Sequence, residues 1–131
     1  TWRKMHRRKQ WIANRTNHEF LIGINDYSRC KMDKDHLTFD YYAMAEVDGF
    51  ETIPKGMVSK VLPASDYAVF YLRGKKEESV QPWIESIYKE WFLKTDYELN
   101  DALRFDFIRY GEIEDENKES QIEIWIPIKR H

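Results

Sequence analysis

Apolar and polar residues alternate along two stretches near the end of the chain, as they do in strands with one buried face. Residues 105–110 read FDFIRY and residues 121–128 read QIEIWIPI. Because successive side chains of a strand point to opposite sides of a sheet, each stretch has one largely apolar or aromatic face. The other face sets a carboxylate beside a ring, Asp106 with Tyr110 and Glu123 with Trp125. Such a face is either solvent-exposed or lines a pocket.

Two other stretches have the apolar spacing of amphipathic helices. The first covers residues 1–15, where Trp2, Met5 and Ile12 lie roughly on one side. The second covers residues 80–94, with Ser79 as a plausible N-cap and Pro82 tolerated in the first turn. Alternation and aromatic content predict further strands at residues 19–25, 38–47 and 66–73. Charged residues 30–35 and the Gly- and Pro-containing residues 49–56 are expected to form loops.

The order of these elements predicts a duplicated α+β fold. Residues 1–63 read helix–strand–strand, and residues 64–131 read strand–helix–strand–strand. The first unit therefore looks like the second with its leading strand missing, since that strand would precede Thr1. We expect one domain with an antiparallel sheet, helices packed on one side of it, and a cleft between the two units.

Composition narrows the function classes. A chain of 131 residues is long enough for one domain with a real core, and an aromatic share of 15% allows a cavity lined with rings. The net charge of −2 argues against non-specific nucleic-acid binding, which needs clustered cations. Charge is nevertheless uneven, because the first fifteen residues carry several Lys and Arg but no acid.

Motifs for catalysis and for tightly bound cofactors are missing from the sequence. The histidines have no paired or HExxH spacing, and no Gly-rich phosphate loop or G-x-S-x-G motif occurs. We therefore expect no metal and no cofactor, and consider an enzyme the less favoured class. Cys30 is the only cysteine, and no apolar run reaches membrane-spanning length, so a cytoplasmic location without membrane contact is expected.

Several stretches together resemble a known family. FDYYAMAEV is similar to its aromatic strand ending in Glu–Val, and IPKGM followed by VLPASDYAVFYLRGK is similar to its Pro–Gly–Met loop and next strand. VQPWIESIYKEWFLKTDYEL and IEIWIPIK are similar to its second helix and closing strand. In order and spacing, from about Phe20 to Lys129, the chain resembles the GyrI-like small-molecule-binding domains. These include the effector-binding domains of bacterial multidrug-responsive and AraC-type transcription regulators.

The resemblance implies a bacterial domain that binds a flat, hydrophobic and often cationic aromatic molecule between its two units. A buried cation needs an anion or the face of a ring, which explains the family's aromatic pockets with a carboxylate. It also implies a DNA-binding domain elsewhere in a full-length regulator, with no direct nucleic-acid contact here. The residues expected to bind the ligand are Tyr42, Met44, Glu46, Tyr71, Trp91, Asp106, Ile108, Tyr110, Glu123 and Trp125.

Strand alternation assigns some of these residues to the cleft. By the resemblance, position 108 faces the ligand, so Asp106 and Tyr110 should border it. The isoleucines of the last strand should meet the helices, which would turn Glu123 and Trp125 toward the cleft.

Two departures from the family pattern bear on the ligand. Ile108 stands where the family often has a glutamate, and Met44 stands where a small residue is common, which would narrow the cleft. Two alternatives therefore stay open. One is a hydrolase of reactive electrophiles acting in the same cleft, and the other is an inhibitor module that binds a protein.

Overall fold

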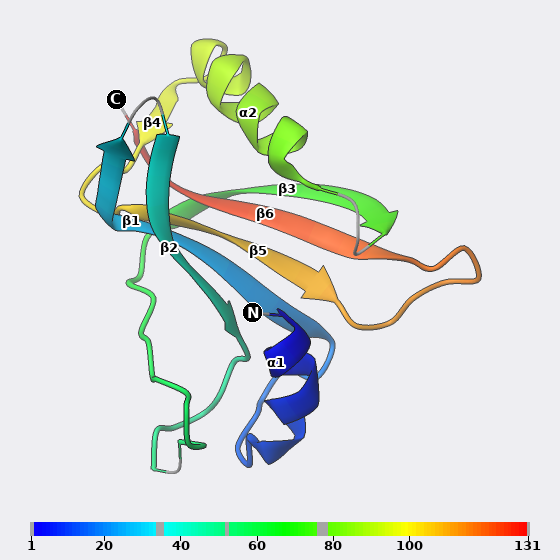
Figure 1. Ribbon diagram of the computed structural model, residues 1–131. Coiled ribbons are helices and arrows are strands. Elements are labelled where there is room, and N and C mark those ends of the chain that lie inside the picture. Colours follow the sequence, from blue (N-terminus) through cyan, green and yellow to red (C-terminus); the bar gives the residue numbers. More distant parts are fainter. Residues whose placement is uncertain (1, 34–35, 52, 76–78, 131) are drawn as a thin grey trace.

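The alternating stretches form one antiparallel sheet with the strand order β2-β1-β5-β6-β3, and β4 is added beside β6 (Figure 1). The computed structural model describes residues 2–33, 36–51, 53–75 and 79–130. The strands are β1 (Phe20–Asp33), β2 (His36–Met44), β3 (Asp66–Lys75), β4 (Tyr97–Leu99), β5 (Phe105–Gly111) and β6 (Glu119–Arg130). The α+β class is therefore confirmed.

Both predicted helices are present. The first is α1 (Trp2–Arg8), continued by the 3-10 turn η1 (Lys9–Trp11), and the second is α2 (Gln81–Lys89), followed by η2 (Trp91–Leu93). The N-cap of α2 is Val80 rather than the predicted Ser79, but Ser79 Oγ accepts a hydrogen bond from the Gln81 N–H at 3.2 Å and so satisfies one of the free donors at the start of the helix. No helix among the described residues is long and apolar enough to cross a membrane.

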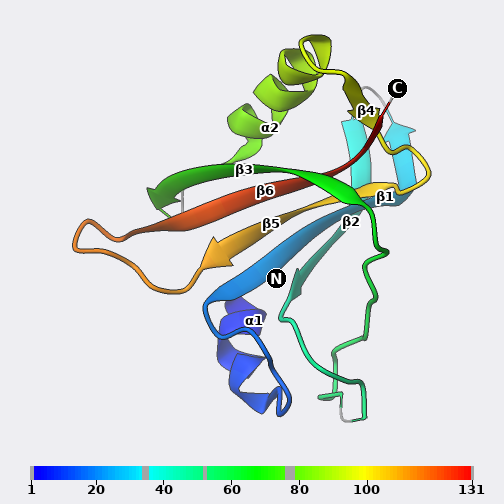
Figure 2. The same ribbon diagram turned by 180° about the vertical axis from the view of Figure 1, so that it is seen from behind.

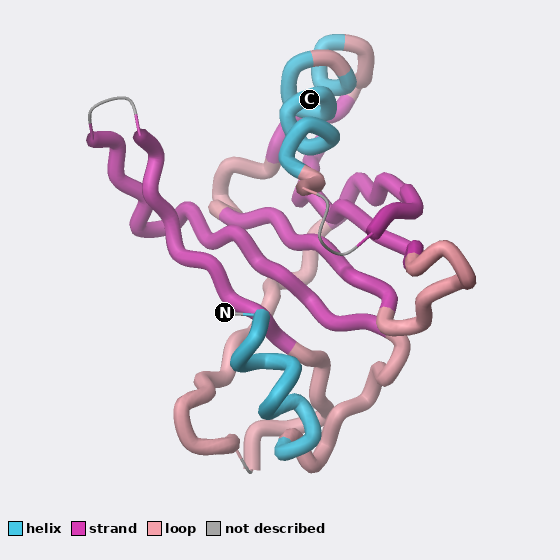
Figure 3. The backbone as a smooth tube through the Cα atoms, turned by 45° about the vertical axis from the view of Figure 1, so that its right-hand side comes forward, coloured by secondary structure: helices cyan, strands magenta, loops and turns pink. Residues whose placement is uncertain are grey.

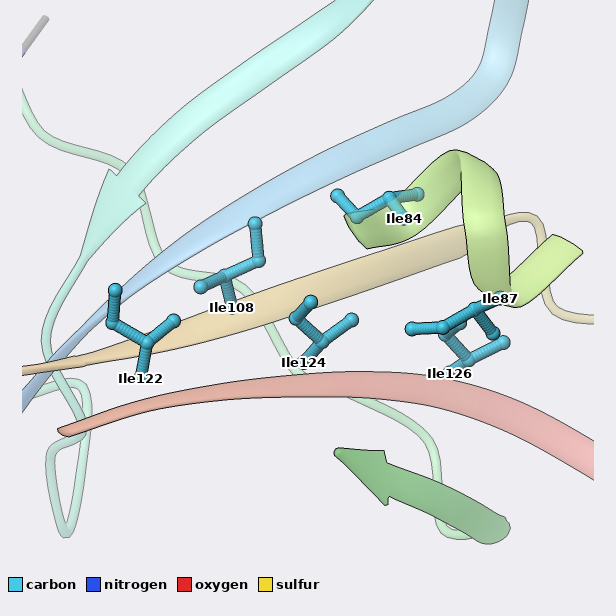
Figure 4. Packing of buried hydrophobic residues seen from close by; sticks show 6 residues of the cluster. All are labelled: Ile84, Ile87, Ile108, Ile122, Ile124 and Ile126. Atoms are coloured by element: carbon cyan, nitrogen blue, oxygen red, sulfur yellow. The ribbon is translucent and has the colours of Figure 1, made fainter. Parts of the chain in front are cut away.

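The register of β5 and β6 divides the sheet into two faces. Phe107 lies opposite Trp125, and Ile108 lies opposite Ile124. On the face that we call the helix face, Ile108 packs with Ile84 and Ile87 of α2 (Figure 4). The same cluster includes Ile122, Ile124 and Ile126 of β6. On the other face, called the ring face, Ile22, Ile24 and Phe107 form a second cluster that includes Trp125. Each face thus buries its own apolar cluster.

Helix α1 also contacts the helix face, at the end of the sheet formed by β1 and β2 (Figure 3). Trp2 Nε1 donates a hydrogen bond of 2.7 Å to the Tyr41 hydroxyl, and its ring meets Tyr110 edge-on at 5.4 Å between centroids. Met5, one turn further, is buried. A glycine is needed at position 23, because a Cβ there would lie 2.3 Å from the Tyr41 hydroxyl oxygen.

The charged stretch 30–35 differs from its predicted loop. β1 continues through Cys30 to Asp33, and β2 begins at His36, so the two strands form a long hairpin with an irregularity between Asp26 and Lys31. Beyond Asp26, β1 pairs with β2 but no longer with β5. Beyond Asp26 the sheet is therefore reduced to this two-stranded hairpin, in which charged residues continue the strands instead of forming a loop.

The strand predicted for residues 38–47 differs in its bounds. β2 runs from His36 to Met44, and Val47 makes only an isolated bridge with Arg15. Pro127 lies near the end of β6, where the pairing with β5 has already stopped, so its missing N–H interrupts no bond to β5. Its carbonyl accepts a hydrogen bond from the Asn100 N–H at 3.0 Å.

The chain between β2 and β3 is the longest connection whose described residues form neither helix nor strand. Residues 45–65 leave the end of β2, extend away from the sheet beside α1, and return to β3 (Figures 1 and 2). A connection of this length without secondary structure is uncommon in a small domain and is often functional. We call it the 45–65 segment.

Candidate functional site

A cavity of about 790 Å³ lies between the sheet, α1 and the 45–65 segment. Such a volume is within the range of pockets that hold small organic ligands. Residues 41–47, which form the end of β2 and the chain just after it, all line the cavity, so both sides of this strand contribute to the wall. Side chains of α1, the 45–65 segment and the sheet complete the lining, among them Lys4, Met5, Arg8, Ile22, Phe50, Ile53, Met57, Lys60, Leu62, Phe107, Arg109 and Trp125.

The floor of the cavity is aromatic and belongs to the ring face. Phe107 and Trp125 are stacked, with ring centroids 5.3 Å apart and planes 18° apart. Tyr67 meets both rings edge-on, at 5.6 Å in each case. Since Phe107 comes from β5 and Trp125 from the paired position of β6, the backbone ladder holds the two rings in place. This floor is therefore a preformed apolar surface.

A buried carboxylate lies beside the floor. Glu123 is 6% exposed, and its Oε1 accepts hydrogen bonds from Trp125 Nε1 at 2.9 Å and Arg109 Nη1 at 3.1 Å. Gln121 Nε2 donates to the other oxygen at 2.9 Å. The charge of Glu123 is thus compensated by Arg109 and its oxygens are satisfied within the protein.

Arg109 itself is held by two rings. Its guanidinium carbon lies 4.4 Å from the centroid of Phe20 and 5.6 Å from that of Trp125. A guanidinium over aromatic faces is stabilised by the ring quadrupoles, in addition to its ion pair with Glu123. The polar part of the floor is therefore an Arg–Glu pair rather than a lone carboxylate.

The outer wall is the 45–65 segment, which is tied to the sheet near its end. Lys60 Nζ lies 3.0 Å from Asp26 Oδ2 of β1 and 4.8 Å from the ring centroid of Tyr42. Burial would raise the pKa of Asp26, but hydrogen bonds from Ser28 and Lys60, with the charge of Lys60, outweigh it and lower this pKa to about 2. The carboxylate is therefore ionised at neutral pH and keeps Lys60 over the cavity.

The beginning of the 45–65 segment is tied to the chain that follows α1. The Thr16 N–H donates to the Glu46 carbonyl at 3.0 Å, and the Asp48 N–H donates to the Asn14 carbonyl at 3.1 Å. The Asn14 side chain also donates to the Gly49 carbonyl. This neighbouring chain is fixed in turn by Arg15, whose Nη2 lies 2.6 Å from Glu112 Oε2. Both ends of the outer wall are thus anchored, and its middle is exposed.

Some of the predicted ligand-binding residues meet at this cavity. Tyr42, Met44, Glu46 and Trp125 all line it. Glu123 lies directly beside Trp125 but is engaged by Arg109. Tyr71 is on the ring face opposite Glu123, yet its side chain is 69% exposed and it lies outside the cavity lining.

The other predicted residues lie on the helix face. Ile108 and Trp91 pack in the α2 cluster, Tyr110 packs against Trp2, and Asp106 is buried nearby. The prediction that Ile108 and Trp125 border one cleft was therefore wrong. Because Phe107, and not Ile108, pairs with Trp125, residues of even number in β5 share a face with the isoleucines of β6.

Asp106 has a structural environment. It is 1% exposed, and it accepts hydrogen bonds from Asn25 Nδ2 at 2.7 Å, the Tyr88 hydroxyl at 3.0 Å and the Tyr27 hydroxyl at 3.2 Å. Burial raises the pKa of Asp106, although these three donors oppose the rise. Burial and the Asp106 charge also raise the pKa values of Tyr27 and Tyr88. Asp106 therefore joins α2 to β1 and β5 beneath the helix.

Sequence reasoning missed the residues that complete the cavity. Phe107 and Arg109 had a signal, because they alternate with Ile108 and needed only the register to β6. Lys4, Arg8 and Lys60 had none beyond their charge, since they reach the cavity from α1 and from an aperiodic segment. Among the described residues, no group of three or more His, Cys, Asp or Glu side chains could hold a metal ion.

Comparison with known protein families agrees with this geometry. Residues 1–128 match the model of the family Cass2, described as integron-associated effector binding protein. A comparison with curated proteins finds no match. The family match covers nearly the whole chain and fits the resemblance to GyrI-like effector-binding domains, which it confirms. An aromatic-floored cavity in a chain with such a match supports small-molecule binding. The chain belongs to the Cass2 family of integron-associated effector-binding proteins.

Proposed function

We propose that this protein reversibly binds a flat, mostly hydrophobic molecule in the cavity between the ring face and the 45–65 segment. The observation that carries the proposal is the stacked pair of Phe107 and Trp125 at the floor of a cavity of about 790 Å³. Aromatic side chains offer large contact areas at low conformational cost, and they accept planar ligands by stacking. Tyr42 and Met44 supply further apolar wall on the β2 side.

The outer wall supports binding of ligands that differ in shape. Phe50 and Ile53 line the cavity and are 45% and 43% exposed, so apolar surface remains for a ligand to cover. Burying apolar surface yields roughly 25 cal/mol per Å², which favours an apolar guest over water at this position. A fixed floor with a wall anchored only at its ends suits a protein that recognises several related compounds.

We further propose that the domain is a bacterial, cytoplasmic sensor, either alone or joined to a DNA-binding domain. The two-unit organisation, with residues 1–63 and 64–131 as repeats, is part of this proposal. It is supported by β1 and β5, which pair with each other. Each comes after a helix in the chain, with the short β4 inserted before β5, and each pairs with the strand that follows it. In this arrangement β2 corresponds to β6, and α1 corresponds to α2.

Tryptophan fluorescence tests the proposal. Planar aromatic compounds of different charge are titrated into the wild type and into Trp125→Ala, and circular dichroism checks that the variant is folded. Saturable changes in the wild type, with at least about tenfold weaker binding in folded Trp125→Ala, are expected because one floor ring is lost. Trp83, which is 58% exposed on α2, provides the control variant Trp83→Ala. Equal binding by all three proteins would contradict the proposed site.

The same titration separates binding from hydrolysis. Glu46 is the only carboxylate among the described lining residues, and a hydrolase needs a positioned acid or base. We therefore expect each compound to be recovered unchanged after incubation. Product formation that depends on Glu46 would favour the hydrolase.

A further inference from the structure

β3 is an edge strand, and its outer side has no neighbouring strand in the described part of the chain (Figure 1). It pairs with β6 residue by residue, from Asp66 opposite Ile128 to Lys75 opposite Glu119. No other backbone group among the described residues forms a hydrogen bond with β3. In an antiparallel pair, every second residue of a strand directs its N–H and C=O away from the neighbour. The outer side of β3 is therefore a row of donors and acceptors that a further strand can pair.

The sequence of β3 lacks the features that usually protect an edge strand. Proteins shield such edges with Lys or Pro, with bulges, with short strands, or with a covering helix or loop. Residues 67–72 of β3 read YAVFYL, without a charge or a proline. The strand is ten residues long, and its register with β6 contains no bulge. A long, regular and uncharged edge of this kind favours pairing with another strand.

The opposite edge of the sheet, β2, is better protected. Its pairing with β1 contains an irregularity. Asp40 sets a charge at this edge and pairs with Arg29 at 2.9 Å. The hydroxyl of Tyr41 accepts a hydrogen bond of 2.7 Å from Trp2, which fixes α1 beside β2. The edge open to a further strand is therefore that of β3.

Tyr71 lies near the middle of this open edge. Its 69% exposure is the largest of any aromatic residue that the structure describes. Sequence reasoning expected Tyr71 at the ligand, but it lies outside the cavity lining. Tyrosine is enriched at protein interfaces, because it combines a large apolar ring with a polar end. An exposed ring at this position therefore fits a surface that becomes covered on association.

We propose that two copies of this chain associate through β3, with the two strands antiparallel and related by a two-fold axis at Tyr71. Side chains that face each other across a strand pair share one face of the sheet, so the axis between identical strands passes through a single residue. An axis at Tyr71 pairs the two exposed rings. The neighbouring Phe70 already packs edge-on against Trp91 at 5.2 Å and needs no further ring. The two sheets would thus continue into each other.

Charge favours this pairing of two copies. β3 has Asp66 at its beginning and Arg73 and Lys75 at its end, with uncharged residues between them. About the axis at Tyr71, Lys75 lies opposite Tyr67 of the second copy. Arg73 lies opposite Val69 of that copy, so like charges do not face each other. The acidic start of each strand lies beside the basic end of the other, whereas a parallel arrangement would bring equal charges together.

Sedimentation of the full chain at concentrations from about 1 μM to about 1 mM tests the association. We expect the wild type to change from monomer to dimer within this range, because a single pair of strands is a small interface. Tyr71→Lys should raise the Kd of the dimer at least about tenfold, since two like charges replace two rings on the axis. Leu93→Lys is the matched control, because Leu93 is 83% exposed and lies in η2, away from β3.

A mixing experiment tests the position of the axis. Tyr71→Glu alone should dimerise as weakly as Tyr71→Lys, because each variant sets two equal charges opposite each other. When one of the two variants carries a fluorescent label and both are mixed, they should associate more tightly than either does with itself. Only a residue that faces its own copy responds in this way. Circular dichroism checks that the variants are folded.

The outcomes decide the proposal. A wild type that stays monomeric up to about 1 mM overturns it. So does a dimer that Tyr71→Lys leaves unchanged, or one that Leu93→Lys weakens to the same extent. A mixture that associates no better than its components contradicts the axis at Tyr71. Residues 66–75 do not line the cavity, so none of these results bears on the proposed binding of a small molecule.

Discussion

Lys60 and Asp26 join the outer wall of the cavity to the sheet, with Lys60 Nζ 3.0 Å from Asp26 Oδ2. Their side chains are 28% and 13% exposed, so the pair is only partly accessible to water. Because the 45–65 segment has no helix or strand, few other contacts of this kind fix it to the ring face. The pair therefore anchors the later end of the outer wall to the sheet.

Acid should weaken this connection. The pKa of Asp26 is lowered from 3.8 to about 2 in the folded protein, so the unfolded chain binds this proton more readily. The contribution of Asp26 to stability is therefore complete above about pH 4 and is lost as the pH falls toward 2. In Lys60→Met, the decrease of melting temperature over this interval should be shallower, because one source of the lowered pKa is gone. An unchanged pH dependence would show that Ser28 alone sets the pKa.

Asp106 should be among the most sensitive positions for stability. In Asp106→Ala the donors of Asn25, Tyr27 and Tyr88 lose their common acceptor in a buried place, and we expect a loss of about 3 kcal/mol in the free energy of unfolding. Urea unfolding measures this loss. The control is Asp101→Ala, where the side chain is 81% exposed and a change below about 0.5 kcal/mol is expected. Similar losses in the two variants would contradict the structural role.

The pH dependence of Asp106 has the opposite sign from that of Asp26. Its pKa is raised in the folded protein, chiefly by burial, so the folded chain binds the proton more tightly than the unfolded chain. This group therefore lowers the free energy of unfolding as the pH rises above about 4. Asp106→Asn has no such proton, and its stability relative to wild type should increase between about pH 4 and pH 7. A constant difference across this range would show that the pKa is not raised.

The secondary structure was largely predictable from the sequence, but the faces of the site were not. The alternation of residue types within β5 and within β6 can be recognised in the sequence, because successive side chains of a strand point to opposite faces. Whether Ile108 or Phe107 shares a face with Trp125 depends on the register between the strands. A shift of one residue would exchange the two faces, and the connection between Gly111 and Glu119 fixes that register through turn geometry that a single sequence does not reveal.

The outer wall was also beyond sequence reasoning. Residues 45–65 have no hydrophobic periodicity, so the sequence does not indicate that Lys60 contacts Asp26 or that Gly56 contacts Arg8. Tyr42, Met44 and Glu46 do line the cavity, but the residues between them line it as well, so alternation alone does not select them.

Arg109 should be required to keep Glu123 buried. Arg109→Met leaves the carboxylate with only the neutral donors of Gln121 and Trp125, and we expect a loss of about 2 kcal/mol in stability. Adding Glu123→Gln removes the uncompensated charge, so the double variant should be more stable than Arg109→Met alone. A double-mutant cycle in urea measures this coupling. Purely additive effects would mean that the ion pair contributes nothing beyond packing.

Gly56 should be important for ligand binding rather than for the sheet. Its φ of +86° is strained for any residue with a Cβ, and a Cβ would also lie 2.8 Å from Arg8 Nη1. Gly56→Ala therefore disfavours the present outer wall by roughly 1–2 kcal/mol, which would weaken binding of planar aromatic compounds by about tenfold. Calorimetry measures this change.

Two further variants separate the causes of the Gly56 effect. In Gly49→Ala the nearest atoms belong to the flexible Glu51 side chain, so this glycine of the same segment should tolerate the change with little loss of affinity. If the contact with Arg8 dominates, Gly56→Ala should lose little additional affinity once Arg8→Gln is present. If the backbone dominates, Gly56→Ala should weaken binding to the same extent whether or not Arg8→Gln is present. Equal affinity of Gly56→Ala and wild type for these compounds would mean that the ligand does not require this conformation of the outer wall.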